Sequence, residues 1–193
     1  MRNKRSPLLA VILLFAVLLL IAAPLLIRQS ILPQAPVDDS RLIDYRNPAL
    51  GFHMLRPEVW DTSEDDQLIL GGASPTMKAV AFVPKNPPNT FIIMYVQTLS
   101  NTESLDSYAA RQVADMQNNK SDMRFSPPKP MTINGLNALE TEATSNVNGE
   151  ARRLRMIVLM NGLRAYALTY FGPVAGTATE RFQSMVDSFG FVQ

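Results

Sequence analysis

Three Asn-Gly pairs lie close together in the second half of the 193-residue chain, and they constrain the fold more than any other feature. The pairs are Asn134-Gly135, Asn148-Gly149 and Asn161-Gly162, which start 14 and 13 residues apart. Asn and Gly tolerate the positive φ angles of a two-residue type I′ hairpin turn, whose twist matches the flanking strands. The runs between the pairs have the length and residue types of strands. The sequence therefore predicts a four-stranded antiparallel meander from Pro130 to Phe171.

The Asn148-Gly149 turn predicts a register that can be checked against the side chains. A two-residue loop there puts mostly apolar pairs on one face, which we predict to be core: Ala143 with Leu154, Thr141 with Met156, and Leu139 with Val158. The other face pairs Glu142 with Arg155 and Thr144 with Arg153, and Glu140 lies diagonal to Arg155. Opposite charges across an antiparallel pair stabilise it by ~0.2 to 1 kcal/mol. A one-residue slip would exchange the two faces, so this agreement supports the register.

The Asn161-Gly162 turn extends the register to the last strand of the meander. It predicts three cross-strand pairs: Arg164 with Leu159, Tyr166 with Ile157, and Leu168 with Arg155. The second face of the meander is then apolar near one end and charged near the other. We expect a helix or loop to cover only part of it.

Two helices are expected to pack on this sheet. Apolar residues recur at three- and four-residue spacing from Ser104 to Asn118, which is typical of an amphipathic helix with one buried stripe. A second helix is predicted to begin at Thr177, where the hydroxyl and Glu180 would form a capping box, and to stop at Gly190. Both apolar stripes are expected to be core.

The N-terminal part of the chain predicts a membrane anchor. Residues 8–27 carry no charge and would form a helix of ~30 Å, which is the hydrocarbon thickness of a bilayer. The alternative is a cleaved secretory signal peptide, whose apolar region is usually shorter, about 7 to 15 residues. Arg2, Lys4 and Arg5 outweigh Arg28 across the segment, which predicts a cytoplasmic N-terminus and a domain outside the cytoplasm.

These features divide the chain into four parts. We expect residues 1–7 to form a basic cytoplasmic tail, 8–27 a transmembrane signal anchor, 28–41 a linker, and 42–193 a single extracytoplasmic domain. The chain contains no cysteine, which excludes disulfides, thiolate metal sites and a cysteine nucleophile. From Arg28 onward there are 15 basic and 17 acidic residues, so the domain lacks the basic surplus of a nucleic-acid-binding protein.

The first half of the domain predicts further strands and an acidic loop. Strands are expected at Leu42–Tyr45, Phe52–Leu55, Lys78–Val83 and Thr90–Leu99. The loop from Asp61 to Asp66 is rich in oxygen ligands, but its spacing is not that of an EF-hand and no glycine occupies the turn position. We interpret it as a solvated turn, with Ca²⁺ binding as the alternative.

The order of elements and several marker residues resemble the PsbP-like family. The markers are turn glycines and aromatic core anchors: Tyr45, Asn47, Gly51, Phe52, Pro57, Trp60, Ser104-Leu105, Asn134-Gly135, Ala165 to Leu168, and Ser188-Phe189. The family includes the extrinsic oxygen-evolving protein of photosystem II and bacterial single-domain relatives such as DcrB-type envelope proteins. The resemblance implies an antiparallel sheet sandwiched between helices and a role in binding or assembly without catalysis. Because His53 is the only histidine, no metal-binding role carries over.

Catalysis finds little support among the residues. A Ser-His-Asp site would need His53, and no Gly-x-Ser-x-Gly motif is present. Glu140 and Glu142 are about 7 Å apart on a strand and are expected to face arginines. A cation-dependent hydrolase using these carboxylates, or the loop around Asp65, is the alternative function. We assign no catalytic, cofactor-binding or metal-binding residues.

The sequence thus predicts an α+β domain, an antiparallel sheet between helices, preceded by one transmembrane helix. Its predicted function is that of a membrane-anchored, non-catalytic binding or assembly module in the plasma membrane. The predicted contact surface for a protein partner at the membrane joins a charged patch, defined as Glu140, Glu142, Arg153 and Arg155, to Tyr166 and Tyr170. Tyr and Arg are enriched at the energetic centres of interfaces.

Overall fold

The structure is a computed structural model that describes residues 38–66, 69, 75–87, 89–119, 123–147 and 149–192. The predicted cytoplasmic tail and membrane anchor, and the linker up to residue 37, lie outside these residues. Within the described ranges, no helix has the length and apolar character needed to cross a bilayer.

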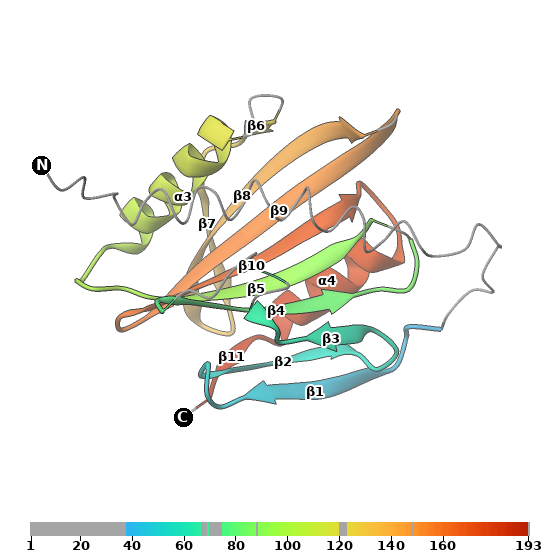
Figure 1. Ribbon diagram of the computed structural model, residues 1–193, viewed down its shortest axis with the longest axis horizontal. Coiled ribbons are helices and arrows are strands. Elements are labelled where there is room, and N and C mark those ends of the chain that lie inside the picture. The colour runs from blue at the N-terminus through green and yellow to red at the C-terminus, as the bar shows by residue number, and fades with distance from the viewer. Residues whose placement is uncertain are drawn as a thin grey trace, which may run out of the picture.

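The described residues form two antiparallel sheets (Figure 1). The large sheet has the strand order β3-β4-β5-β10-β9-β8-β6, and β7 also pairs with β8. Its strands are β3 (Asp61–Ser63), β4 (Met77–Val83), β5 (Phe91–Thr98), β6 (Arg124–Phe125), β7 (Lys129–Ile133), β8 (Leu136–Val147), β9 (Glu150–Asn161) and β10 (Arg164–Pro173). The small sheet has the order β1-β2-β11, from β1 (Leu42–Asn47), β2 (Phe52–Pro57) and β11 (Gly190–Phe191).

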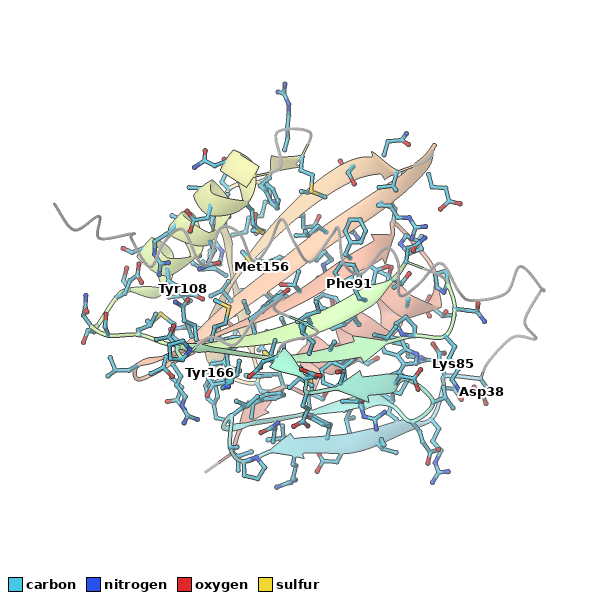
Figure 2. The ribbon with its side chains drawn as sticks, viewed as in Figure 1. Asp38, Lys85, Phe91, Tyr108, Met156 and Tyr166 are labelled. Atoms are coloured by element: carbon cyan, nitrogen blue, oxygen red, sulfur yellow. The ribbon has the colours of Figure 1, made fainter. Side chains whose placement is uncertain are left out.

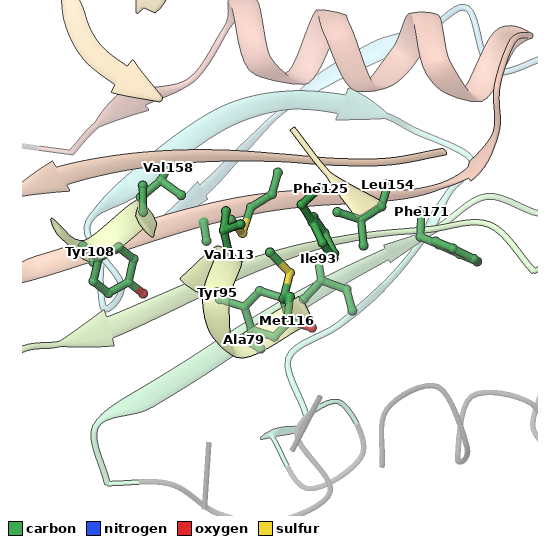
Figure 3. Packing of buried hydrophobic residues seen from close by; sticks show 14 of the residues in the cluster. Ala79, Ile93, Tyr95, Tyr108, Val113, Met116, Phe125, Leu154, Val158 and Phe171 are labelled. Atoms are coloured by element: carbon green, nitrogen blue, oxygen red, sulfur yellow. The ribbon is translucent and has the colours of Figure 1, made fainter. Parts of the chain in front are cut away.

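Two helices lie on opposite faces of the large sheet, as predicted. Helix α3 (Leu105–Asn119) begins after Ser104, whose Oγ accepts a hydrogen bond from the Ser107 backbone N–H at 3.1 Å. Its buried stripe of Tyr108, Val113 and Met116 packs on the sheet (Figure 3). Helix α4 (Thr177–Asp187) packs on the other face beside the small sheet. The large sheet therefore separates two hydrophobic cores, and the α+β prediction is confirmed.

The predicted meander consists of β7, β8, β9 and β10 in consecutive pairing. Asn134 and Gly135 both have positive φ, 48° and 78°, as a type I′ turn requires. The register across the second turn also agrees with the prediction, because Glu142 lies opposite Arg155. The face carrying Leu139 and Met156 is buried against α3.

The register at the third turn differs from the prediction by two residues. Arg164 lies opposite Asn161, and Tyr166 lies opposite Leu159 instead of Ile157. The turn residues are Gly162 and Leu163, with φ of 59° at Gly162. A glycine with positive φ at the first turn position is the type II′ pattern, which does not need Asn161 in the turn. Because the shift is even, every side chain stays on its predicted face.

Helix α4 begins at Thr177 as predicted, but its N-terminal cap and its C-terminal end differ from the prediction. The N-cap is Gly176, whose carbonyl accepts the first backbone hydrogen bonds, and no side chain caps the helix. The predicted capping box of Thr177 and Glu180 is therefore wrong. The helix ends at Asp187 and not at Gly190. Ser188 is the C-cap, and the next backbone N–H, that of Phe189, donates to the Val186 carbonyl at 3.1 Å in a tighter turn. The chain then enters β11, where Gly190 lies opposite His53.

Candidate functional site

The charged patch lies on β8 and β9, on the face of the large sheet that also carries α4. Cross-strand pairing brings its members together as predicted, with Glu142 opposite Arg155. Glu140 lies two residues away on the same strand face. The patch divides into a buried half around Arg155 and a more exposed half around Arg153.

Arg155 links the sheet to α4 through hydrogen bonds. Its side chain is 11% exposed. Nε and Nη2 donate to Glu140 Oε1 at 2.8 and 2.5 Å, and Nη1 and Nη2 donate to Gln183 Oε1 on α4, both at 3.1 Å. The guanidinium also lies over the Phe182 ring, 5.1 Å from its centroid. Arg155 thus satisfies its donors inside the fold and presents little surface to a partner.

Arg153 is the exposed counterpart of Arg155 on the same strand. Its Nη2 donates to Glu142 Oε2 at 3.2 Å, and the two side chains are 30% and 37% exposed. Glu142 also lies 3.4 Å from Arg155 Nε, so it joins the two arginines. The two side chains are thus joined diagonally across the strands, while part of each remains open to solvent.

Tyr166 and Tyr170 do not reach the surface, because they are 1% and 0% exposed. The Tyr166 hydroxyl donates to the Leu50 carbonyl at 3.0 Å, and the Tyr170 hydroxyl donates to the Pro173 carbonyl at 2.8 Å. Burial raises the pKa of both phenols. Tyr166 lies far along β10 from the patch, near the start of that strand (Figure 2). The solvent-facing part of the predicted contact surface is therefore formed by charged residues.

Two further cations belong to this face and were not in the predicted patch. Arg124 on β6 lies opposite Thr144, which in turn lies opposite Arg153. Lys129 on β7 lies opposite Glu140. The Lys129 pairing follows from the Asn134-Gly135 turn and could have been predicted from the sequence. The Arg124 pairing could not, because a two-residue strand leaves no periodic signal.

The residues considered for catalysis or metal binding have structural partners. His53 Nδ1 lies 3.9 Å from Asp44 Oδ1, with Gly190 beneath the ring. In the acidic loop, Glu64 accepts a hydrogen bond from the Tyr45 hydroxyl, and Asp66 accepts from Lys78 Nζ at 2.6 Å. Among the described residues, no three Asp, Glu, His or Cys side chains are grouped so that they could bind a metal ion.

Comparisons with known proteins identify the fold. No family model and no curated protein matches the sequence. The solution structure of cyanobacterial PsbP (CyanoP) from Synechocystis sp. PCC 6803 is similar, with a TM-score of 0.60 and 15% identity over 83% of this chain and 98% of CyanoP. A crystal structure from Bacteroides thetaiotaomicron VPI-5482 has a TM-score of 0.52 and 15% identity, covering 78% of this chain and 48% of that one. The expected resemblance to the PsbP-like family is thus confirmed at the level of the fold.

Proposed function

We propose that this chain is a membrane-anchored, non-catalytic binding or assembly module whose domain lies outside the cytoplasm and docks a protein through the charged patch. The observation that carries the proposal is the open half of that patch. Arg153 and Glu142 lie diagonally across β8 and β9 and are joined by a hydrogen bond of 3.2 Å, yet remain about one-third exposed. Charged groups that are ordered before a partner arrives lose less conformational freedom on binding.

Binding fits these residues better than catalysis does. Glu140 and Glu142, the carboxylates considered for a hydrolase, already accept hydrogen bonds from Arg155 and Arg153. The charge of each carboxylate is therefore already balanced by an arginine within the fold. The PsbP-like fold adds support, because the resemblance implies binding or assembly roles. The apolar run at residues 8–27 and the basic residues ahead of it support the tether and its orientation.

The orientation predicts the outcome of protease treatment. Protease added to intact cells or spheroplasts should digest the domain and leave a fragment of a few kilodaltons in the membrane, because only residues 1–27 and part of the linker would be protected. Immunoblotting against an N-terminal and a C-terminal tag measures this. A protected domain would contradict the orientation, and a soluble product that begins after the apolar run would contradict retention of the anchor.

Charge reversal at the open half of the patch tests the docking site. Arg153→Glu in the full chain should reduce partner recovery from crosslinked membranes by about fivefold or more, because it places a second carboxylate beside Glu142. Quantitative mass spectrometry of the tagged protein measures the recovery. Arg41→Glu is the matched control, because Arg41 is an exposed arginine paired with Glu58 outside the patch. Equal recovery from both variants, with unchanged melting temperature, would exclude the patch as the docking site.

A further inference from the structure

The part of the large sheet that α4 leaves open carries an excess of positive charge. This open face is defined as the part of the α4-side surface of β6, β7, β8 and β9 that α4 does not cover. It contains three cations and two carboxylates: Arg124, Lys129, Arg153, Glu140 and Glu142. A fourth cation, Arg155, lies at its border beneath α4. Asp187 borders it on α4, where it accepts a hydrogen bond from Gln183 Nε2 at 2.8 Å. The two carboxylates pair with Arg153 and Arg155.

The surplus charge comes from Arg124 and Lys129. Both side chains are exposed. Neither makes an ion pair with any residue in the described ranges. Their positions are nevertheless set by the sheet, because each lies directly opposite a β8 residue. They are therefore cations whose backbone positions are set by the sheet and which have no ion-pair partner inside the described part of the fold.

The charges form three rows across the strands. The row through Thr144 is positive, with Arg124 on one side and Arg153 on the other. The next row contains Glu142 above the buried Arg155, and the third contains Lys129 beside Glu140. Consecutive rows on one strand face are about 7 Å apart. The positive positions of the outer rows are thus about 14 Å apart, with a carboxylate between them.

We propose that the open face binds an acidic segment of a partner protein, whose separated carboxylates pair with Arg124 and Arg153 in one row and with Lys129 in the other. A protein segment fits better than a nucleic acid or an anionic membrane, because a continuous row of phosphates would also face Glu142. Like charges opposed at an interface cost binding free energy. The proposal rests on the proposed function and names the chemistry of the partner at that site.

A peptide with matching carboxylate spacing tests the proposal. In an extended chain, Glu at every fourth residue places carboxylates about 14 Å apart on one side. The probe is a fluorescein-labelled Glu-Ser-Ser-Ser repeat of about 13 residues, with a Gln-Ser-Ser-Ser repeat as its control. Fluorescence anisotropy with the full chain in neutral detergent measures binding. We expect the Glu peptide to bind more tightly than the Gln peptide, and less tightly as salt is added.

Single substitutions locate the binding. Lys129→Gln and Arg124→Gln should each weaken binding of the Glu peptide about two- to fivefold, the range expected for an exposed ion pair. Lys85→Gln is the matched control, because Lys85 is also exposed and lies in the loop that joins β4 to β5 (Figure 2). It should leave the affinity unchanged. Equal losses in all three variants, or no binding of the Glu peptide, would overturn the proposal.

Two competitors separate a protein segment from other anions. An oligodeoxynucleotide of equal charge represents nucleic acid, and dihexanoyl phosphatidylglycerol represents a lipid headgroup. Displacement of the Glu peptide by either competitor at lower concentration than by unlabelled Glu peptide, with the same dependence on Arg124, would overturn the assignment to protein.

If Arg153→Glu loses its partners in cells but the Glu peptide does not bind, the docking site stands and the acidic partner is wrong. If the peptide binds but Arg153→Glu keeps its partners, the docking site is wrong instead.

Discussion

Two arginines on one strand show how position decides the role of a side chain. Arg153 and Arg155 face the same side of β9, and each pairs with a glutamate of β8. Arg155 is 11% exposed and reaches Gln183 on α4, whereas Arg153 is 30% exposed and donates to Glu142 of the sheet. The first arginine therefore holds the fold together, and the second remains accessible to a partner.

This difference predicts unequal costs for the same substitution. Arg155→Ala should lower the free energy of unfolding by about 3 kcal/mol, because removing one member of a largely buried ion pair leaves Glu140 and Gln183 without their donor. Arg153→Ala should cost about 0.2 to 1 kcal/mol, because its pair is solvated. Urea unfolding of the two variants measures the difference. Equal costs would show that α4 does not depend on Arg155.

At the scale of elements, the turns account for both the success and the error of the sequence prediction. The pairing of Ile133 with Leu136 and of Val147 with Glu150 gives β7, β8 and β9 the expected registers. At the third turn, Asn161 of the Asn161-Gly162 pair is the last residue of β9, and Gly162 takes the first turn position. Local sequence does not distinguish these cases, because both turn types place a glycine with positive φ between two strands.

Other elements depend on contacts that a linear pattern does not contain. The burial of Arg155 depends on Gln183 and Phe182. Both lie on α4, and Gln183 is 28 residues later in the chain than Arg155. Strand β11 has two residues and becomes a strand only because it pairs with β2. The meander, α3 and the charged pairing were predictable from periodicity. The pairing of β11 with β2 in the small sheet, and the division of the patch into buried and open halves, could not be predicted in this way.

Gly149, which lies between β8 and β9, gives a prediction at this scale. Gly149 has a φ of 85°, and a Cβ added at this position would meet no atom within 4 Å, so only backbone strain opposes a side chain. Gly149→Val should lower the free energy of unfolding by about 1 to 3 kcal/mol, because β-branched residues resist positive φ. Gly149→Asn should cost less, because Asn tolerates this region. Equal melting temperatures for the two variants would contradict this account of the turn.

At the scale of the whole molecule, the large sheet distributes the aromatic residues between two cores. Tyr95 and Tyr108 lie in the core under α3, and Tyr166 and Tyr170 lie in the core shared by α4 and the small sheet. Tyr45 packs at the edge of the second core, where its hydroxyl donates a hydrogen bond to Glu64. All five tyrosines of the chain are thereby wholly or partly withdrawn from solvent. Because these buried phenols titrate at alkaline pH, the stability of both cores depends on pH in the alkaline range.

Burial is the main cause that raises the pKa of each of the five phenols above its ordinary value. An exposed phenol in the unfolded chain has a pKa of about 10. Below that pH both states keep the proton, and the contribution of the tyrosines to stability is complete. As the pH rises above about 10, the unfolded chain releases protons first, so the free energy of unfolding falls until the folded phenols also titrate.

We therefore expect the free energy of unfolding to fall above about pH 10 by up to ~1.4 kcal/mol per pH unit for each buried tyrosine. Urea unfolding across this range measures the slope, and phenolate absorbance should appear together with unfolding. Tyr95→Phe is the informative variant, because burial alone raises the pKa of Tyr95. It should reduce the slope by one proton, whatever it does to stability at neutral pH. An unchanged slope would show that Tyr95 titrates equally in the folded and unfolded chain, and that the core under α3 admits water.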